Sequence, residues 1–351
     1  MDSMNELLNY ISGFYSPEMY AALNAQIHRW SISRPLAGKR ILDATPVFRN
    51  TMVKYTALLA GGADLTVAVG KDIPHDPQII RQLPRYGIRV ADEKILQEKF
   101  DAVADCAGRH CRVSSRYGYA ELTRSGLEYY RGVKHPVFSV DSGILKQFET
   151  TFGTGESFFR AMEQLGYRDF AGKKLLIFGG GKVGRGVAFY ALKKEMQTII
   201  VDPQKIHIQP QFRLISPDDP EINALISGAW CIVSATGKAG VLQKFSTRMM
   251  QSKAVIANMG VEDEFGNDMP VSRVLNDKHP LNFILDEPTR INYIDPTMAL
   301  SNTALVKLIT GELPPGLHTP PKDMEMAIIN DLRAAGTLDL ETDIILKDNK
   351  L

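Results

Sequence analysis

The glycine-rich stretch at 175–192, LLIFGGGKVGRGVAFYAL, constrains the fold of this chain more than any other part of its sequence. The apolar run at 175–178 has the length of a buried strand, and apolar residues after the glycines recur at helical spacing. Between them, five glycines fall within eight residues, at 179–186. Such a density of glycine predicts a tight strand-to-helix turn whose backbone comes very close to another group.

Three of these glycines, Gly179, Gly181 and Gly184, form a G-x-G-x-x-G pattern. Where it joins a strand to a helix, this pattern is typical of dinucleotide-binding folds. The first glycine allows the turn, the second lets a pyrophosphate reach the backbone, and the third lets helix and strand pack closely. The phosphates are then expected at the helix N-terminus, where free N–H groups favour anions. The alternative is a glycine-rich turn that binds no ligand.

An acidic residue follows the motif where dinucleotide-binding folds distinguish NAD from NADP. The strand expected at 198–202 ends in Asp202, about 20 residues beyond the glycines. A carboxylate there accepts hydrogen bonds from a ribose 2′-hydroxyl and repels a 2′-phosphate, which predicts NAD as the cofactor. Lys205 and Arg213 follow in the sequence and keep NADP open as the alternative.

Short apolar strands alternate with helical segments along the chain, which indicates an α/β fold with parallel, doubly wound sheets. Helices are expected over the first thirty residues and at 50–63, 155–166 and 299–311. Besides the two strands already described, strands are expected at 39–46, 65–70, 87–91, 100–108, 136–143, 230–237 and 253–260.

Composition excludes several classes of protein. With 351 residues, 44% of them apolar, the chain is long enough for two domains. A net charge of +1 and the lack of a basic cluster argue against a nucleic-acid partner, and no apolar run reaches the length of a membrane span. The acidic N-terminus is not expected to be a signal peptide, and three cysteines suggest a reducing, cytoplasmic setting. A small-molecule substrate is therefore expected.

Several segments, taken in order, resemble the S-adenosyl-L-homocysteine hydrolase (adenosylhomocysteinase) family. They include RPLAGKRILDATPVFRNTMVKYTALLAGGADL, DSGILKQFETTFGTGESFFRAMEQ, IVSATGKAGVL, KAVIANMG and DPTMALSNTALVKLITGELPPGLHTPPKDMEMAI. The resemblance implies a Rossmann-type doubly wound NAD domain at 151–294. It also implies a discontinuous α/β substrate domain at 1–150, completed by 295–351, and a homodimer. In that family, NAD oxidises a ribose 3′-hydroxyl, homocysteine is eliminated, water adds and the ketone is reduced again.

The cofactor-binding residues that the resemblance implies are largely present. Asp202 stands where the family has a ribose-binding Glu, and Thr123 and Ser125 match two positions of a Thr-Thr-Thr run that reaches the cofactor from the substrate domain. The remaining matches are Gly181, Lys182, Val183 and Gly184 in the phosphate loop, and Thr236 and Asn258 at further NAD contacts.

The catalytic residues of the family are not matched. The family's Lys falls at Leu145, next to Lys146, and its Asp falls at Glu149. A family His is replaced by Asp295, and the substrate-binding Asp is replaced by Cys106. Loss of this set, with the cofactor site kept, predicts that the substrate changed and the redox cofactor did not. We take Lys146, Glu149, Asp295 and Cys106 as the candidate catalytic residues.

Each of these candidates has a structural alternative. Lys146 and Glu149 have the i,i+3 spacing of a solvated helix pair, and Asp295, which precedes a proline, suits a helix cap. Cys106 suits an ordinary loop position at a strand end. The Cys and His residues at 106–111 lack a common zinc spacing, so no metal is expected.

We therefore expect an NAD-dependent enzyme that oxidises a secondary hydroxyl of a nucleoside- or sugar-like small molecule, and not S-adenosylhomocysteine hydrolysis itself. One alternative is a hydroxyacid-type NAD dehydrogenase that releases NADH. The other is a non-catalytic regulator or partner subunit that holds NAD.

Overall fold

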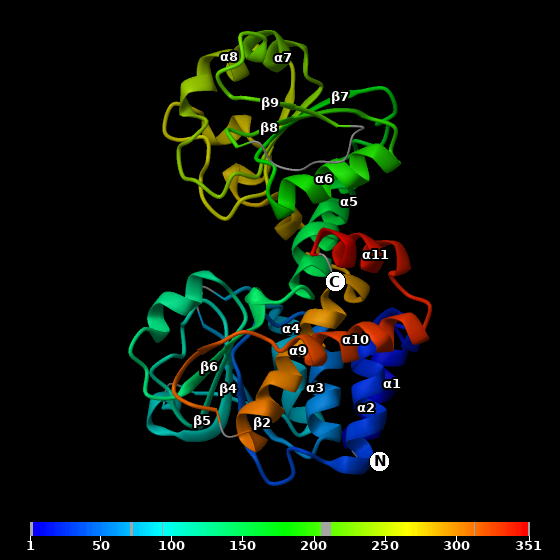
Figure 1. The fold of residues 1–351 in the computed structure, drawn as a ribbon, viewed down its shortest axis with the longest axis vertical. Coiled ribbons are helices and arrows are strands. Elements are labelled where there is room, and N and C mark those ends of the chain that lie inside the picture. The colour runs from blue at the N-terminus through cyan, green and yellow to red at the C-terminus, as the bar shows by residue number, and fades with distance from the viewer. Residues whose placement is uncertain (1–2, 71–72, 93, 205–211, 312, 350–351) are drawn as a thin grey trace. The chain divides into compact units, whose positions relative to one another are not determined.

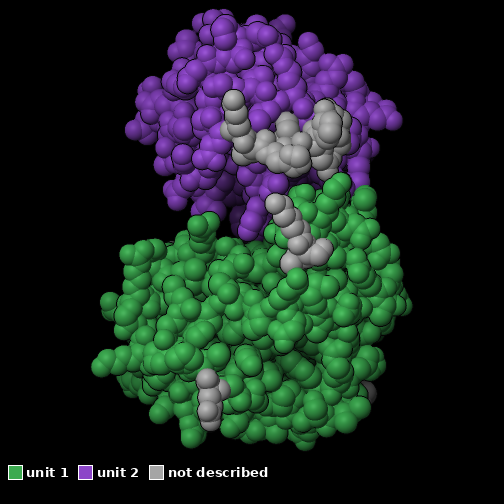
Figure 2. All heavy atoms as spheres, in the orientation of Figure 1, with its two compact units in different colours: residues 1–148, 291–351 green, residues 149–290 purple. Residues whose placement is uncertain are grey.

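The computed structural model describes residues 3–70, 73–92, 94–204, 212–311 and 313–349. The chain divides into two compact units, unit 1 with residues 1–148 and 291–351, and unit 2 with residues 149–290 (Figure 2). Each unit is built on its own parallel sheet with helices packed around it (Figure 1). The predicted α/β fold class is confirmed.

Unit 1 contains a seven-stranded sheet in the order β12-β6-β5-β4-β1-β2-β3, and the strands pair in parallel. Because the strands are parallel, the carboxyl ends of β1, β4, β5 and β6 meet at one edge, where ligands bind in sheets of this kind. The strands are β1 (Arg40–Asp43), β2 (Asp64–Val67), β3 (Arg89–Val90), β4 (Lys99–Asp105), β5 (Ser114–Glu121), β6 (Pro136–Ser139) and β12 (Gly316–His318).

The helices of unit 1 come from both ends of the chain. The longest, α9 (Ile291–Thr310), packs against α2, α3, β4 and β5. It begins before the predicted start at 299 and contains Pro296 in its second turn. Burial of the turn around Pro296 stabilises the longer helix. The other α-helices are α1 (Ser3–Ser12), α2 (Ala21–Ser33), α3 (Thr51–Ala60), α4 (Pro77–Gln82), α10 (Lys322–Ala334) and α11 (Asp339–Asp348).

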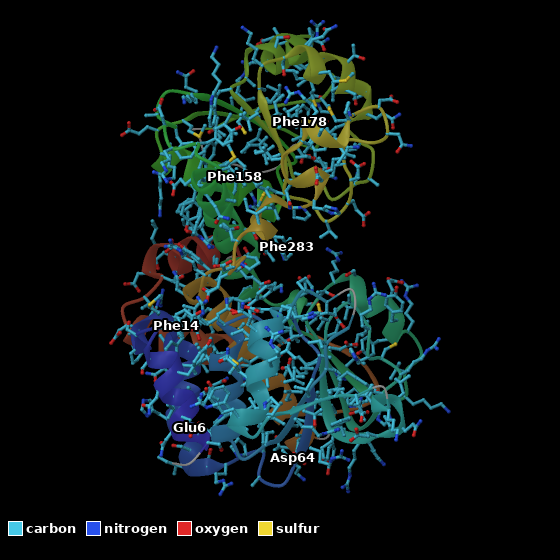
Figure 3. The ribbon with its side chains drawn as sticks, turned by 180° about the vertical axis from the view of Figure 1, so that it is seen from behind. Glu6, Phe14, Asp64, Phe158, Phe178 and Phe283 are labelled. Atoms are coloured by element: carbon cyan, nitrogen blue, oxygen red, sulfur yellow. The ribbon has the colours of Figure 1, made fainter. Side chains whose placement is uncertain are left out.

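Unit 2 contains a five-stranded sheet in the order β11-β10-β7-β8-β9, again with parallel pairing. The central strand β7 leads through the glycine stretch into α6. Phe178 lies at the end of β7 (Figure 3). Its ring centroid lies 5.4 Å from that of Phe245. The elements are α5 (Thr154–Gln164), β7 (Lys174–Phe178), α6 (Lys182–Lys193), β8 (Gln197–Val201), β9 (Arg213–Ile215), α7 (Ile222–Gly228), β10 (Cys231–Ser234), α8 (Ser246–Gln251) and β11 (Val255–Asn258).

Three strands, β5, β9 and β12, were not predicted. The segment of β5, SSRYGYAE, has no apolar run, yet it pairs with β4 on one side and β6 on the other. Its strand conformation is therefore set by its neighbours, which a local pattern does not reveal. β9 and β12 have only three residues each.

Candidate functional site

The three motif glycines between β7 and α6 have different surroundings. Gly179 has a left-handed backbone, with φ of 101°, and a Cβ there would lie 2.3 Å from the carbonyl oxygen of Ala235. A Cβ at Gly184 would lie 1.8 Å from the carbonyl oxygen of Gly179. At Gly181, by contrast, no atom of the described residues lies within 4 Å of an added Cβ. Gly181 thus leaves space for a ligand to reach the backbone.

Helix α6 begins directly after Gly181, whose carbonyl oxygen accepts the Arg185 N–H at 3.0 Å. Leading N–H groups of an α-helix have no partner within the helix and carry the positive end of its dipole. Lys182 and Val183 lie in this first turn and are partly exposed. The turn therefore has the geometry of a phosphate site.

A pocket of about 270 Å³ opens beside this loop. Gly179 and Gly181 line it, together with Asp202 after β8 and Thr236 after β10. Most of the remaining wall is apolar, which suits a nucleoside. The apolar part consists of Phe178, Val201, Pro203, Pro217, Ala235, Val241, Leu242 and Phe245.

Asp202 is joined to the glycine loop. Its Oδ2 accepts the Gly180 N–H at 2.8 Å, and its Oδ1 accepts the Gln204 N–H at 2.8 Å. The carboxylate is only partly buried and lines the pocket, so it stands at the strand end where the sequence predicted a ribose-binding acid. The residues around this pocket fit a dinucleotide with a free 2′-hydroxyl.

The two basic residues that kept NADP open are Lys205 and Arg213. Arg213 pairs with Glu221 at 3.0 Å. Lys205 lies outside the described residues. Lys244 lines the pocket but pairs with Asp218 at 3.0 Å.

Thr236 follows β10 and Asn258 ends β11, and their polar atoms bond within the protein. The Asn258 amide donates to the carbonyl oxygens of Glu262 and Lys278, at 2.8 and 2.7 Å. The N–H and Oγ1 of Thr236 both donate to Glu264, at 2.8 and 2.7 Å. Contact of Thr236 and Asn258 with the cofactor stays a prediction. Glu264 was missed because no local pattern marks it.

At the carboxyl edge of the unit 1 sheet, Glu121 is a second buried carboxylate that the sequence reasoning missed. It accepts the N–H groups of Ala107 and Gly108, at 3.0 and 3.1 Å, and the N–H and Oγ1 of Thr123, at 2.8 and 2.6 Å. Its burial raises the pKa of Glu121 above the usual value. Ser125 donates to Thr123 Oγ1 at 3.4 Å, so Thr123 and Ser125 belong to one network. Their reach to the cofactor stays a prediction.

Cys106 follows β4 at the same edge and is 7% exposed. Its N–H donates to Asp105 Oδ1 at 2.8 Å. Asp105 also accepts the hydroxyl of Tyr130 at 2.7 Å and the N–H of His110 at 2.9 Å, which holds the turn after β4 in place. A role of Cys106 toward a substrate stays a prediction.

Lys146 and Glu149 do not form a regular helical pair. Lys146 belongs to unit 1 and is 4% exposed, which a lysine on a solvated helix face would not be. Glu149 belongs to unit 2 and lies in the π-helical turns Phe148–Gly153, which lead into α5. The solvated-pair alternative for Lys146 is therefore wrong.

Two kinds of feature are absent from the part of the chain that the structure describes. None of its helices combines the length and apolar character that crossing a bilayer requires. Nor do its His, Cys, Asp and Glu residues form a group of three or more that could hold a metal ion.

Comparisons with known proteins relate the chain to one family. A family model described as putative NAD(P)-binding matches residues 167–267, which lie within unit 2. Adenosylhomocysteinase from Sulfolobus acidocaldarius is 26% identical over 264 residues, covering 66% of this chain and 62% of that protein. The enzyme from Thermotoga maritima is 25% identical over 288 residues, covering 73% of this chain and 69% of that protein. The chain is similar to the adenosylhomocysteinases along about two thirds of its length.

This relationship confirms the predicted resemblance, and the match to the NAD(P)-binding model confirms NAD as the class of cofactor. Among solved structures, a dipicolinate synthase chain from Bacillus halodurans aligns with a TM-score of 0.57 at 12% identity. That alignment covers 78% of this chain and 99% of the other, and it supports the fold alone. The match to the Sulfolobus adenosylhomocysteinase spans less than two thirds of that protein's length.

Asp295, the candidate that follows the start of α9, caps a helix. Its two carboxylate oxygens accept the N–H groups of Ala22 and Leu23, at 2.9 Å each, at the start of α2. The side chain is 1% exposed, and burial raises the pKa of Asp295 to about 7. This placement favours the capping alternative over a catalytic role, although the capped helix is α2 and not the helix that contains Asp295.

We expect an Asp295→Asn variant to gain stability relative to the wild type as the pH rises. A carboxyl whose pKa is raised on folding stabilises the protein at pH values below its unfolded pKa, and that contribution is lost as the pH rises through about 7. Between pH about 4 and about 8, the wild type should lose on the order of 2 to 4 kcal/mol that the variant retains. Chemical denaturation of both proteins across this range measures the difference.

The matched control is Asp169→Asn, since Asp169 is exposed and pairs with Lys173. This variant removes an exposed carboxyl and should not reproduce the gain of Asp295→Asn. Parallel stability curves for the wild type and Asp295→Asn would contradict the prediction.

Proposed function

We propose that the protein is an NAD-dependent oxidoreductase that removes hydride from a secondary hydroxyl of a nucleoside- or sugar-like small molecule. The observation that carries this proposal is the pocket beside Gly181, with a helix N-terminus for phosphates and Asp202 for a ribose. The reaction is proposed to differ from S-adenosylhomocysteine hydrolysis, because the residues at the family's catalytic positions have changed. The proposal includes a cytoplasmic homodimer.

In this proposal the two units have separate tasks. Unit 2 holds the cofactor, with the loop from Gly179 to Gly184 on the pyrophosphate and Asp202 on the adenosine ribose. When bound, NAD supplies the hydride acceptor. Unit 1 holds the substrate at the carboxyl edge of its sheet, where Cys106, Thr123 and Ser125 lie.

Oxidation of an alcohol also requires a group that accepts the hydroxyl proton as hydride leaves the carbon. We propose the Nζ amine of Lys146 for this role and Glu149 as the group that orients it. The segment before Lys146 is held in place, because Glu325 accepts the Leu145 N–H at 3.1 Å. A Cβ at Gly143 would lie 2.3 Å from the same Glu325 carboxylate, which brings this segment close to α10.

The proposal is tested with purified protein, NAD, and a panel of nucleosides and sugars. We expect the wild type to bind NAD more tightly than NADP by calorimetry and to form NADH with at least one compound in a single turnover. Lys146→Ala should lose NADH formation by about a hundredfold or more, as removal of a general base does, and keep the NAD affinity. Lys134→Ala, an exposed lysine of the same unit, is the control.

Three results would count against this function. Tighter binding of NADP than of NAD would contradict the role of Asp202. NADH formation by Lys146→Ala at the wild-type rate would remove Lys146 from the chemistry. Release of homocysteine from S-adenosylhomocysteine, dependent on both protein and NAD, would return the protein to the activity of its relatives.

A further inference from the structure

Glu264 is a fully buried carboxylate that joins two neighbouring strand ends of unit 2. It lies in the loop after β11, and its side chain reaches the residues that follow β10. Its Oε2 accepts the Ser234 hydroxyl, the Thr236 N–H at 2.8 Å and Thr236 Oγ1 at 2.7 Å. Its Oε1 accepts the Gly237 N–H at 2.6 Å. One carboxylate thus accepts from four donors, one on the last residue of β10 and three in the segment that follows it, and Glu264 is 0% exposed.

The loop that carries Glu264 is shaped to admit this carboxylate. A Cβ at Gly260 would lie 2.0 Å from Glu264 Oε1, so only glycine leaves the required space. Asn258 fixes the same loop, because its Oδ1 accepts the Gly260 N–H at 2.9 Å and its amide donates to the Glu262 carbonyl oxygen at 2.8 Å. The loop after β11 therefore fixes the position of Glu264, and Glu264 in turn fixes the segment that follows β10.

The residues that Glu264 holds form one wall of the pocket beside the glycine motif. Thr236 lines that pocket opposite the residues that follow β8. The preceding Ala235 lies so close to Gly179 that a Cβ at Gly179 would come within 2.3 Å of the Ala235 oxygen. A shift of the segment 235–237 would therefore also move the glycine turn.

We infer that Glu264 is a positioning residue for the cofactor, which acts by holding Thr236 and Gly237 as a fixed wall of the dinucleotide pocket. This role rests on the proposed function, since it takes the pocket to be the NAD site. The same role specifies how Thr236 contributes to cofactor binding. Its N–H and hydroxyl donate to Glu264, so Thr236 presents its carbon atoms to the ligand, and the phosphates depend on the start of α6.

The test is a Glu264→Gln variant of the full chain, with NAD affinity measured by calorimetry at a temperature where circular dichroism shows it folded. An amide offers one acceptor oxygen in place of two, so at least one N–H of the loop loses its partner. We expect the Kd for NAD to rise about tenfold or more, the effect of one buried N–H left unpaired. The matched control Glu262→Gln removes the same charge from an exposed position of the same loop and should leave the Kd unchanged.

A loss of stability alone is separated from this effect by Ile226→Val. Ile226 is buried in the core of unit 2 and does not line the pocket, so this variant should be less stable but bind NAD normally. A Thr236→Val variant removes one of the four bonds and should weaken NAD binding by a smaller factor. Because both residues act through one contact, the effects of Thr236→Val and Glu264→Gln should not add in the double variant.

Each outcome decides one question. Wild-type Kd values in Glu264→Gln, or fully additive effects in the double variant, would overturn the positioning role and leave the proposed function standing. If Glu264→Gln does not fold, an unchanged Kd in Thr236→Val overturns the role. Failure of the wild type to bind NAD would overturn the proposed function itself, and the role of Glu264 with it.

Discussion

A Gly181→Val variant is expected to fold normally and to bind NAD at least about a hundredfold more weakly than the wild type. Gly181 has an ordinary φ of −70°, and no atom of the described residues lies within 4 Å of an added Cβ, so the folded chain can accept a side chain there. The added carbon atoms would occupy the space through which a pyrophosphate reaches the start of α6. Calorimetry with NAD measures the loss, and circular dichroism with thermal unfolding shows that the fold is kept.

Unchanged NAD affinity in this variant would show that the ligand does not approach the backbone at Gly181. The control is Gly228→Ala at the end of α7, which has open space for a Cβ and does not line the pocket. It should leave the NAD affinity unchanged.

A Gly184→Ala variant, unlike Gly181→Val, is expected to be destabilised, with a loss of about 3 kcal/mol or more in the free energy of unfolding. Its Cβ would lie 1.8 Å from the carbonyl oxygen of Gly179 and 3.3 Å from Ile177 Cγ2. The first of these atoms belongs to the backbone of the tight turn, so α6 would have to move away from β7. Chemical denaturation measures the change.

Gly228→Ala is again the control. It should change the free energy of unfolding by only a few tenths of a kcal/mol, because it merely replaces glycine by a residue of higher helix propensity. Equal stability of Gly184→Ala and the wild type would contradict the close contact between α6 and the glycine turn. Together, the two variants distinguish a glycine needed for ligand binding, Gly181, from a glycine needed for folding, Gly184.

Gly186 lies outside the G-x-G-x-x-G pattern, but helix packing requires a glycine there. A Cβ at Gly186 would lie 1.8 Å from the carbonyl oxygen of Thr151, and one at Gly155 would lie 2.3 Å from the backbone of Gly186. Helices α5 and α6 therefore meet backbone to backbone at these glycines. The sequence showed a surplus of glycine, and the structure assigns it to helix packing.

Much of the fold was accessible from the sequence, because its signals are local. Strands such as β7, β8, β10 and β11 are short apolar runs, and the turn after β7 needs glycine for reasons of backbone conformation and space. Asp202 was accessible too, since its position depends on a strand end a fixed distance beyond the motif. The strand β5 was missed because it is stabilised by β4 and β6 and not by its own composition.

Only the tertiary structure decided which N–H and hydroxyl groups the buried carboxylates bind. Asp295 accepts an N–H at Leu23, 272 residues away in the chain, and this favours the capping alternative over a catalytic role. Glu264 and Glu121 bond to loops that follow neighbouring strands, 28 and 14 residues earlier at Thr236 and Ala107. A carboxylate in a sequence shows its charge but not its donors, and burial without donors is so costly that the folded chain must supply them. For that reason the sequence determined the cofactor loop and Asp202 beside it, and only the packed sheets determined which segments the buried acids Glu121, Glu264 and Asp295 hold in place.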